Sequence, residues 1–480
     1  MPTLEWIGKS KVINHHQEVP FRVLERKYSF DENGQHDEDN GSENMIIRGD
    51  NLEALKALLP RYEGRIKCIY IDPPYNTGNE GWVYNDNVND PKIKKWLGEV
   101  VGKEGEDLTR HDKWLCMMYP RLKLLQKLLA NDGIIFISID DTECSNLILI
   151  CNEIFGASNF VANVSWQRTY SPRNDSKGIV SEVEHLVVFS KNPGWQPNKL
   201  PRTEAMDSRY KNPDNDVAPW KSSDAFAPGA ATHQGMVYAI QHPFTGKMLY
   251  PSNGRCWRYQ QSSMLEYMQG WCNYRLENLH DEKERARVCG IDESAVRKDV
   301  LAIVLEEPLE VSAAKAQKVY NRGRWPGFYF TKGGYGGIAR KTYLENVGGR
   351  LPTNLWMYEE TGHTDEAKKE LISLFGGRSP FDTPKPTRLL DFVLKVAGTS
   401  ETLMLDSFAG SGTTAHAVLN ANKADNGNRH FILIEMMDYA DSITAERVKR
   451  VIKGYGEGKN AVDGTCLLYT SDAADDLTRV

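Results

Sequence analysis

Apolar residues in the first third of the chain recur at two spacings, which predict strands alternating with helices. Short apolar runs at residues 45–48, 68–71 and 134–139 have the length of buried β-strands. Between them, the apolar residues of 52–59 and 114–129 recur every three or four positions, as they do on one face of a helix. The succession of strand, helix and strand predicts a parallel α/β sheet.

This alternation is lost between about residues 195 and 356, where Pro, Gly, Trp and Tyr are frequent. It returns with a helical pattern at 365–374 and with strand patterns at 403–406 and 431–434. The polar, acidic run 31–41 is typical of a solvated loop. We therefore predict an N-terminal extension with an acidic loop at residues 1–44. One sheet domain follows in two halves, 45–194 and 371–465, with an inserted domain at 195–370 between them.

Composition narrows the class of protein. The chain has 480 residues, of which 40% are hydrophobic and 26% charged, as in a soluble protein of two or three domains. The net charge of −6 means that any affinity for nucleic acid must come from local patches. The 8 cysteines form no C-x-x-C pair, and no apolar run approaches 18 residues, so we expect a cytoplasmic protein with reduced thiols and no membrane span.

One stretch combines three features that suit a flat ligand with an amine. The apolar run 68–71 leads to Asp72, then to Pro73 and Pro74, and then to Tyr75. Two prolines hold the neighbouring side chains rigidly and leave carbonyls free to accept hydrogen bonds. The carboxylate and the carbonyls would accept from the exocyclic amine of a nucleobase, and the Tyr75 ring would stack on the flat ring of that base. In duplex DNA such a base must first be flipped out of the stack.

A second motif follows the strand predicted at 403–406 and is rich in glycine. The turn lets a ligand approach the backbone closely, because Gly410 and Gly412 tolerate backbone angles that other residues avoid. No Lys follows the glycines, which excludes a Walker phosphate-binding loop. Glu435 ends the next predicted strand, where a carboxylate can accept from ribose hydroxyls. The candidate cofactor-binding residues of this region are Asp406, Phe408, Ala409, Gly410, Gly412, Thr413 and Glu435.

These two motifs resemble those of a known enzyme family. Asp72-Pro-Pro-Tyr75 resembles the catalytic motif of amino-group DNA methyltransferases, and residues 408–412 resemble their S-adenosylmethionine motif. The catalytic motif comes first, which resembles the circularly permuted β class. Residues 72–78, the loop with Trp82 and Tyr84, 137–141 and 443–447 more narrowly resemble the modification subunits of type III restriction systems.

The resemblance implies a Rossmann-like, permuted S-adenosylmethionine-dependent methyltransferase sheet with residues 195–370 as a target-recognition domain. It implies methylation of adenine N6, because N4-cytosine enzymes more often carry Ser in place of Asp72. It places Asp50 near the adenine of the cofactor, and Lys385 and Thr387 near its methionine end. Asp50 is equally well explained as a helix cap. Expected partners are double-stranded DNA, a restriction subunit with helicase and nuclease activity, and a second copy of the chain.

Two other functions stay open on the sequence alone. An N4-cytosine methyltransferase would use the same amine chemistry, and a non-catalytic DNA-specificity module would position a partner nuclease. No metal site is predicted, because His111 and His185 lack ligand spacing and are interpreted as structural. Asn76 and Thr77 could line the pocket or shape the turn.

Basic residues accompany the aromatic residues in the later part of the inserted domain. Between residues 315 and 350 the one carboxylate is Glu345. Aromatic residues there could form an ordinary core, but the accompanying Lys and Arg favour contact with DNA phosphates. The candidate DNA-binding residues are Arg322, Arg324, Trp325, Lys332, Arg340 and Lys341.

The end of the chain has a different character. From Cys466 to Asp476 the sequence resembles the in-frame translation of a sequencing-library transposon adapter. We interpret residues 466–480 as a non-biological tail and expect the natural protein to continue beyond about Thr465. The prediction is that the nucleotides that encode this tail match an adapter. Genomic sequence that runs through the region unchanged would contradict it.

Overall fold

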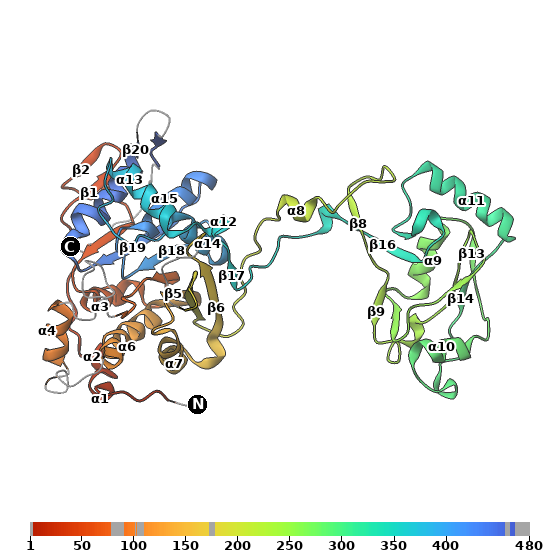
Figure 1. The fold of residues 1–480 in the computed structure, drawn as a ribbon, viewed down its shortest axis with the longest axis horizontal. Coiled ribbons are helices and arrows are strands. Elements are labelled where there is room, and N and C mark those ends of the chain that lie inside the picture. Colours follow the sequence, from red (N-terminus) through yellow and green to blue (C-terminus); the bar gives the residue numbers. More distant parts are fainter. Residues whose placement is uncertain are drawn as a thin grey trace. The chain divides into compact units, whose positions relative to one another are not determined.

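The computed structural model describes residues 3–77, 91–100, 102, 110–171, 178–456 and 461–465 (Figure 1). The chain divides into two compact units, of which unit 1 comprises residues 1–200 and 351–480 and unit 2 comprises 201–350. The loop with Trp82 and Tyr84 and the tail 466–480 lie outside the described residues.

Unit 1 is built on an eight-stranded sheet. All neighbouring strands are parallel except β7, which is antiparallel to both β5 and β6. The α/β fold predicted from the sequence is confirmed. From one edge to the other the strands are β17 (Leu355–Trp356), β6 (Phe160–Gln167), β7 (Val183–Ser190), β5 (Leu129–Ile139), β4 (Ile66–Ile71), β18 (Leu403–Asp406), β19 (His430–Glu435) and β3 (Met45–Arg48).

Helices cover both faces of this sheet, so the central strands are apolar on both sides. In β4, Ile69 and Ile71 belong to one hydrophobic cluster, and Cys68 and Tyr70 belong to the other. The first cluster contains residues of α3 (Asn51–Tyr62), α6 (Arg110–Leu128) and α7 (Cys144–Phe155). The second contains residues of α14 (Thr387–Ala397), α15 (Thr413–Asp425) and α16 (Glu446–Lys453). The remaining longer helices of unit 1 are α4 (Pro91–Val100) and α13 (Thr364–Phe375).

The N-terminal part of unit 1 confirms one prediction and corrects another. Asp50 caps α3, because its carboxylate accepts from the backbone N–H groups of Leu52 at 2.9 Å and Glu53 at 3.1 Å. The run 31–41 is not a simple loop, since β1 (Ser29–Asp31) pairs with β2 (Gly34–His36). The Asp31 carboxylate stabilises the turn of this hairpin by accepting from the backbone N–H groups of Asn33 and Gly34. Composition alone does not show such local hydrogen bonds.

Unit 2 has its own sheets and its own aromatic core. Its sheets have the strand orders β11-β10-β14-β13, β15-β16-β8 and β12-β9. Trp220, Trp257, Trp271 and Phe328 are buried in one cluster. Its strands are β8 (Trp220–Asp224), β9 (Phe226–Pro228), β10 (Ile240–Gln241), β11 (Met248–Leu249), β12 (Arg255–Trp257), β13 (Tyr274–Glu277), β14 (Ala302–Leu305), β15 (Phe328–Phe330) and β16 (Ile338–Tyr343). Its longer helices are α9 (Gln261–Gln269), α10 (Glu282–Cys289) and α11 (Leu309–Arg322).

The bounds of unit 2 are narrower than those of the inserted segment 195–370. Residues 351–370 are part of unit 1, because β17 pairs in parallel with β6, Leu355 with Ser165 and Trp356 with Trp166. Trp356 is buried against Phe392 of α14. The chain thus rejoins unit 1 at Leu351, whereas composition had placed the end of the inserted domain at residue 370.

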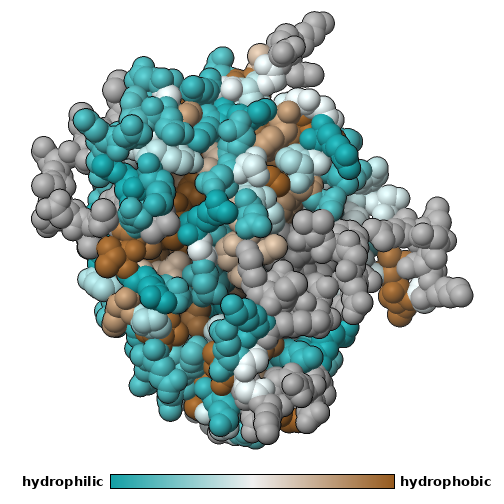
Figure 2. All heavy atoms as spheres, turned by 90° about the vertical axis from the view of Figure 1, so that its left-hand side faces the viewer, coloured by the Kyte–Doolittle hydropathy of each residue, from teal (hydrophilic) through white to brown (hydrophobic). Residues whose placement is uncertain are grey.

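Three further properties concern the part of the chain that the structure describes. None of its helices is long and apolar enough to cross a membrane. Its cysteines are free and buried. Figure 2 shows the side of unit 1 on which β1, β2 and α3 lie, where hydrophilic residues cover most of the surface and hydrophobic residues fill small areas between them.

Candidate active site

The two sequence motifs meet at the carboxyl ends of two central strands of the sheet. β4 and β18 are parallel neighbours, with Cys68 beside Met404 and Ile69 beside Leu405. Their carboxyl ends therefore lie side by side, which is where ligands bind in open α/β sheets. A hollow opens between them and is lined by Tyr70, Asp72, Phe381, Thr383, Pro384, Lys385, Asp406, Phe408, Ala409, Gly410, Ser411, Thr413 and Thr414.

A larger cavity of about 290 Å³ lies elsewhere and contains neither motif. It is lined by β3, α16 and the N-terminal hairpin, with apolar side chains such as Ile46, Phe431 and Val448. Size alone would favour this cavity as the functional site. The smaller hollow has the stronger claim, because carboxylates, a lysine and a glycine turn converge on it.

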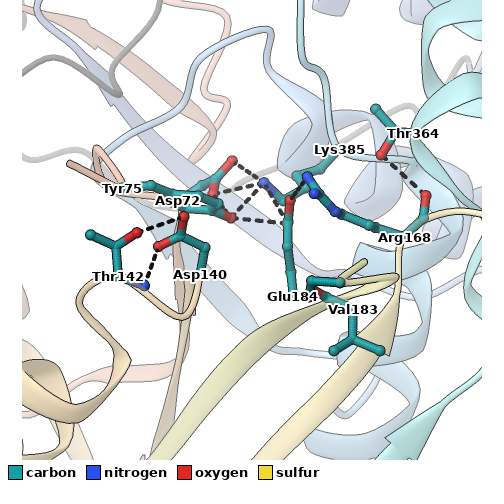
Figure 3. Close-up of polar contacts among 10 residues, drawn as sticks. Asp72, Tyr75, Asp140, Thr142, Arg168, Val183, Glu184, Thr364 and Lys385 are labelled. Carbon is teal, nitrogen blue, oxygen red and sulfur yellow. Dashed lines mark hydrogen bonds and ion pairs between the residues drawn. The ribbon is translucent and has the colours of Figure 1, made fainter. Parts of the chain in front are cut away.

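Asp72 is the centre of a buried polar cluster (Figure 3). The Lys385 ammonium donates to both Asp72 oxygens, at 2.8 and 2.7 Å, and the Tyr75 hydroxyl donates to Oδ1 at 2.9 Å. Asp72 is only 8% exposed, and this burial raises the pKa of its carboxyl while the Lys385 charge opposes the rise. The structure therefore brings together two residues that the sequence assigned to different ligands.

Glu184 completes this cluster, and the sequence did not identify it. It lies in β7, where its Oε1 accepts from Arg168 at 3.1 Å. Its Oε2 lies 3.1 Å from the Tyr75 hydroxyl, whose single proton serves either this oxygen or Asp72 Oδ1. Lys385 Nζ lies 3.5 Å from the same Oε2. A lone carboxylate in the apolar run of β7 is the one sequence signal that could have indicated it.

The Pro-Pro turn is tied to the core of unit 1. The indole N–H of the fully buried Trp114, in α6, donates to the Pro74 carbonyl at 2.6 Å. Asn76 adopts a left-handed backbone conformation, with φ at 61°, and its amide donates to the buried Glu143 carboxylate. Asn76 therefore shapes the turn, and Trp114 is a further residue of the site that sequence reasoning missed.

The glycine turn is held by carboxylates at the ends of two strands. Gly410 and Gly412 have left-handed φ angles of 52° and 78°. The Gly410 N–H donates to Glu435 Oε2 at 2.8 Å, and the Phe408 N–H donates to Asp406 Oδ1 at 3.0 Å. A Cβ on Gly412 would lie 3.0 Å from the Thr444 carbonyl oxygen, so both space and backbone angle favour glycine there.

Asp406 and Glu435 thus serve the backbone of the turn in this structure. Asp406 also accepts from the Thr414 hydroxyl at 2.6 Å, and burial raises the pKa of its carboxyl to about 7. Glu435 accepts from the Met437 N–H at 3.0 Å with its second oxygen. The predicted contact of Glu435 with ribose hydroxyls stays a prediction.

Behind the turn, the buried Arg447 links several elements. Its guanidinium donates to Thr413 Oγ1 at 2.8 Å, Glu370 Oε2 at 2.8 Å and Thr387 Oγ1 at 3.0 Å. Thr387 itself donates to Glu370 at 2.6 Å and does not line the hollow. Thr387 therefore acts here as a support of the turn, whereas Lys385 reaches the hollow.

The predicted outer contacts differ in their surroundings. Asp50 caps α3, lies 3.8 Å from Arg121 and is not among the residues that line the hollow, so its contact with a cofactor stays a prediction. In unit 2, Arg322, Arg324 and Lys332 are exposed and Arg340 is partly exposed. Trp325 stacks on Tyr320 with 4.7 Å between ring centroids.

Lys341 corrects the prediction of a DNA contact. Its side chain is 0% exposed, and its ammonium lies 2.5 Å from both Asp214 and Asp216. A phosphate could reach it only if both ion pairs broke. The basic pattern indicated a surface charge because the two aspartates lie more than a hundred residues away in sequence.

Comparison with known proteins gives one family and several relatives. The family model described as DNA methylase (N6_N4_Mtase) matches residues 66–446. The Mod subunit of the type III restriction-modification enzyme StyLTI from Salmonella typhimurium is 32% identical over 86% of this chain and 58% of that protein. The EcoPI Mod subunit of Escherichia phage P1 is 30% identical over 90% of this chain and 63% of that protein.

A shorter kind of relative is matched over most of its length. The type II methyltransferase M.KpnI of Klebsiella pneumoniae is 28% identical over 82% of this chain and 81% of that protein. The chain spans about three fifths of the length of the two type III subunits.

The buried ion pairs of Lys341 predict a large effect on stability. Lys341→Met keeps the aliphatic stem but leaves Asp214 and Asp216 as buried charges without their cation, so the free energy of unfolding should fall by about 3–5 kcal/mol. Differential scanning calorimetry of the full chain checks this. Lys332→Met removes an exposed charge and should change stability by less than about 0.5 kcal/mol. Equal melting of the two variants would contradict the burial of Lys341.

Asp406 predicts a pH dependence of stability. Its pKa is about 7 in the fold against the ordinary 3.8, so between these values the folded state keeps a proton that the unfolded state has released. Stability should therefore fall as pH rises from 4 to 7, by about 1.4 kcal/mol per pH unit from this group. Thermal unfolding of the wild type and Asp406→Asn over this range isolates the contribution. Parallel curves for the two proteins would contradict it.

Proposed function

The chain belongs to the DNA methylase family, and we propose that it transfers a methyl group from S-adenosylmethionine to the N6 amine of adenine in double-stranded DNA. The observation that carries the proposal is the convergence of Asp72 and the glycine turn on one hollow. Asp72 can accept hydrogen bonds from an amine, and the glycine turn lets a ligand come close to the backbone. Both are needed when an amine must meet a methyl donor.

The residues around the hollow fit a charged nucleoside cofactor. The left-handed Gly410 and Gly412 leave room for a ligand beside the backbone. The Asp406 and Glu435 carboxylates already hold the Phe408 and Gly410 N–H groups, and their further lone pairs can accept from ribose hydroxyls or an ammonium. When bound there, S-adenosylmethionine supplies a methyl group on a sulfonium leaving group.

Asp72 would act on the amine that receives the methyl group. An exocyclic amine is a weak nucleophile, because its lone pair is delocalised into the ring. Asp72 and a proline carbonyl can accept its two hydrogens and let the nitrogen become tetrahedral. The Pro73 carbonyl is the better candidate, since that of Pro74 already accepts from Trp114. After transfer the nitrogen carries one proton too many, and Asp72 is the adjacent base that can take it.

The choice of adenine rests on family likeness and not on the geometry. An N4-cytosine amine has the same hydrogens and the same need for an acceptor. Asp at position 72 favours adenine, because Ser is more frequent there in cytosine enzymes of this class. Nucleoside analysis of the methylated DNA decides between N6-methyladenine and N4-methylcytosine.

We further propose that the chain is part of the modification subunit of a type III restriction-modification system. The StyLTI and EcoPI relatives are named Mod subunits of type III enzymes, and the chain matches 58% and 63% of their length. Unit 2 is the proposed reader of the DNA sequence, with Arg322, Arg324 and Lys332 as exposed cations for phosphates. A restriction subunit would supply cleavage, and a second copy of the chain is the proposed oligomeric partner.

Substitution of Asp72 tests the reaction directly. Asp72→Asn keeps the side-chain shape but removes the charged acceptor, so methyl transfer from tritiated S-adenosylmethionine to unmethylated DNA of mixed sequence should fall by at least about a hundredfold. Cofactor binding by titration calorimetry should persist. Asp132→Asn, an exposed carboxylate paired with Lys67 at the other end of β4, is the matched control. Undiminished transfer by Asp72→Asn would remove Asp72 from the mechanism.

A further inference from the structure

One lysine stands between two buried carboxylates that come from different strands. Lys385 Nζ lies 2.7 Å from Asp72 Oδ2 and 3.5 Å from Glu184 Oε2. Figure 3 shows the three side chains converging, with Asp72 from the end of β4 and Glu184 from β7. Asp72 and Glu184 are 8% and 6% exposed. The Lys385 ammonium therefore interacts more strongly with Asp72 than with Glu184.

This arrangement conflicts with the task that Asp72 has in methyl transfer. Both of its oxygens accept from Lys385, and Oδ1 also accepts from Tyr75. An amine that approaches Asp72 must displace one of these donors. The nitrogen also gains positive charge during transfer, and an ammonium held on Asp72 would repel it. Release of Lys385 without a new partner would leave a buried cation uncompensated, which is costly.

Glu184 is placed to become a second partner for this cation. Arg168 occupies its Oε1 at 3.1 Å, while Oε2 faces both Lys385 and the Tyr75 hydroxyl. A movement of less than about 1 Å would bring the ammonium within the usual 2.7–2.9 Å of a charge-assisted hydrogen bond to Oε2. That movement frees an Asp72 oxygen and keeps the buried charges paired.

We propose that Glu184 is a positioning residue that takes over Lys385 from Asp72 when the target amine binds. The exchange rests on the proposed function, since it requires an amine at Asp72. Glu184 acts through Lys385 and does not touch the reacting atoms. Without the second carboxylate, the ammonium stays on Asp72 and competes with the substrate.

Two substitutions at Glu184 separate a role of charge from a role of shape. In single-turnover transfer from tritiated S-adenosylmethionine to unmethylated mixed-sequence DNA at saturating cofactor, Glu184→Gln should slow the reaction about ten- to a hundredfold. Glu184→Asp retains a carboxylate and should be the faster variant. The reverse order, with the isosteric Gln tolerated and Asp not, would mean a structural role and overturn the exchange.

A double-mutant cycle tests whether Glu184 works through the lysine. Lys385→Met removes the cation that has to be moved, so addition of Glu184→Gln should then change the rate less than about twofold. If the two substitutions instead multiply their separate effects, Glu184 acts independently of Lys385 and the proposal fails.

Two further measurements define the comparison. Asp141→Asn removes a 73% exposed carboxylate that pairs with His185, the neighbour of Glu184, and should keep the wild-type rate. Cofactor affinity measured by titration calorimetry should be the same in the wild type and both Glu184 variants, which a disrupted fold would not give. If the wild type transfers the methyl group and Glu184→Gln does so equally fast, the exchange is overturned and the proposed function stands. No transfer by the wild type overturns the proposed function and the exchange with it.

Discussion

The pairing of β4 with β18 is the constraint on which the rest of unit 1 depends. Two residue pairs, Cys68 with Met404 and Ile69 with Leu405, join segments that lie more than three hundred residues apart in sequence. Through this pairing the Asp72 carboxylate, which follows β4, and the glycine turn, which follows β18, lie side by side at the carboxyl ends of the strands. Because apolar residues fill both faces of the strands, polar chemistry is confined to the strand ends.

Local signals in the sequence were sufficient for part of this arrangement. The cap of α3 by Asp50, the bounds of β3 and the positions of both motifs at strand ends follow from short patterns. Glu184, Trp114 and the buried Lys341 did not follow from such patterns. Glu184 meets Tyr75 and Lys385, Trp114 meets Pro74, and Lys341 meets Asp214. Each of these partners lies at least 40 residues away in sequence, and only the tertiary fold decides which distant group is met.

The site concentrates buried carboxyl groups. Asp72, Glu184, Asp406 and Glu435 are each less than 9% exposed. All four have donors, from Lys385, Tyr75 and Arg168 or from the backbone of the glycine turn. These contacts offset much of the desolvation of the carboxylates, but a hydrophobic core would be more stable. Stability is thus reduced where the chemistry requires charge in a dry environment.

The connections of unit 2 have a consequence for how such proteins diversify. The chain leaves unit 1 after Leu200 and returns at Leu351, and none of the eight strands of the unit 1 sheet lies between these residues. Replacement of residues 201–350 by another compact segment would leave every strand pairing of that sheet in place. Recombination within a gene could therefore exchange unit 2, the proposed reader of the DNA sequence, while the residues around Asp72 and the glycine turn are inherited unchanged.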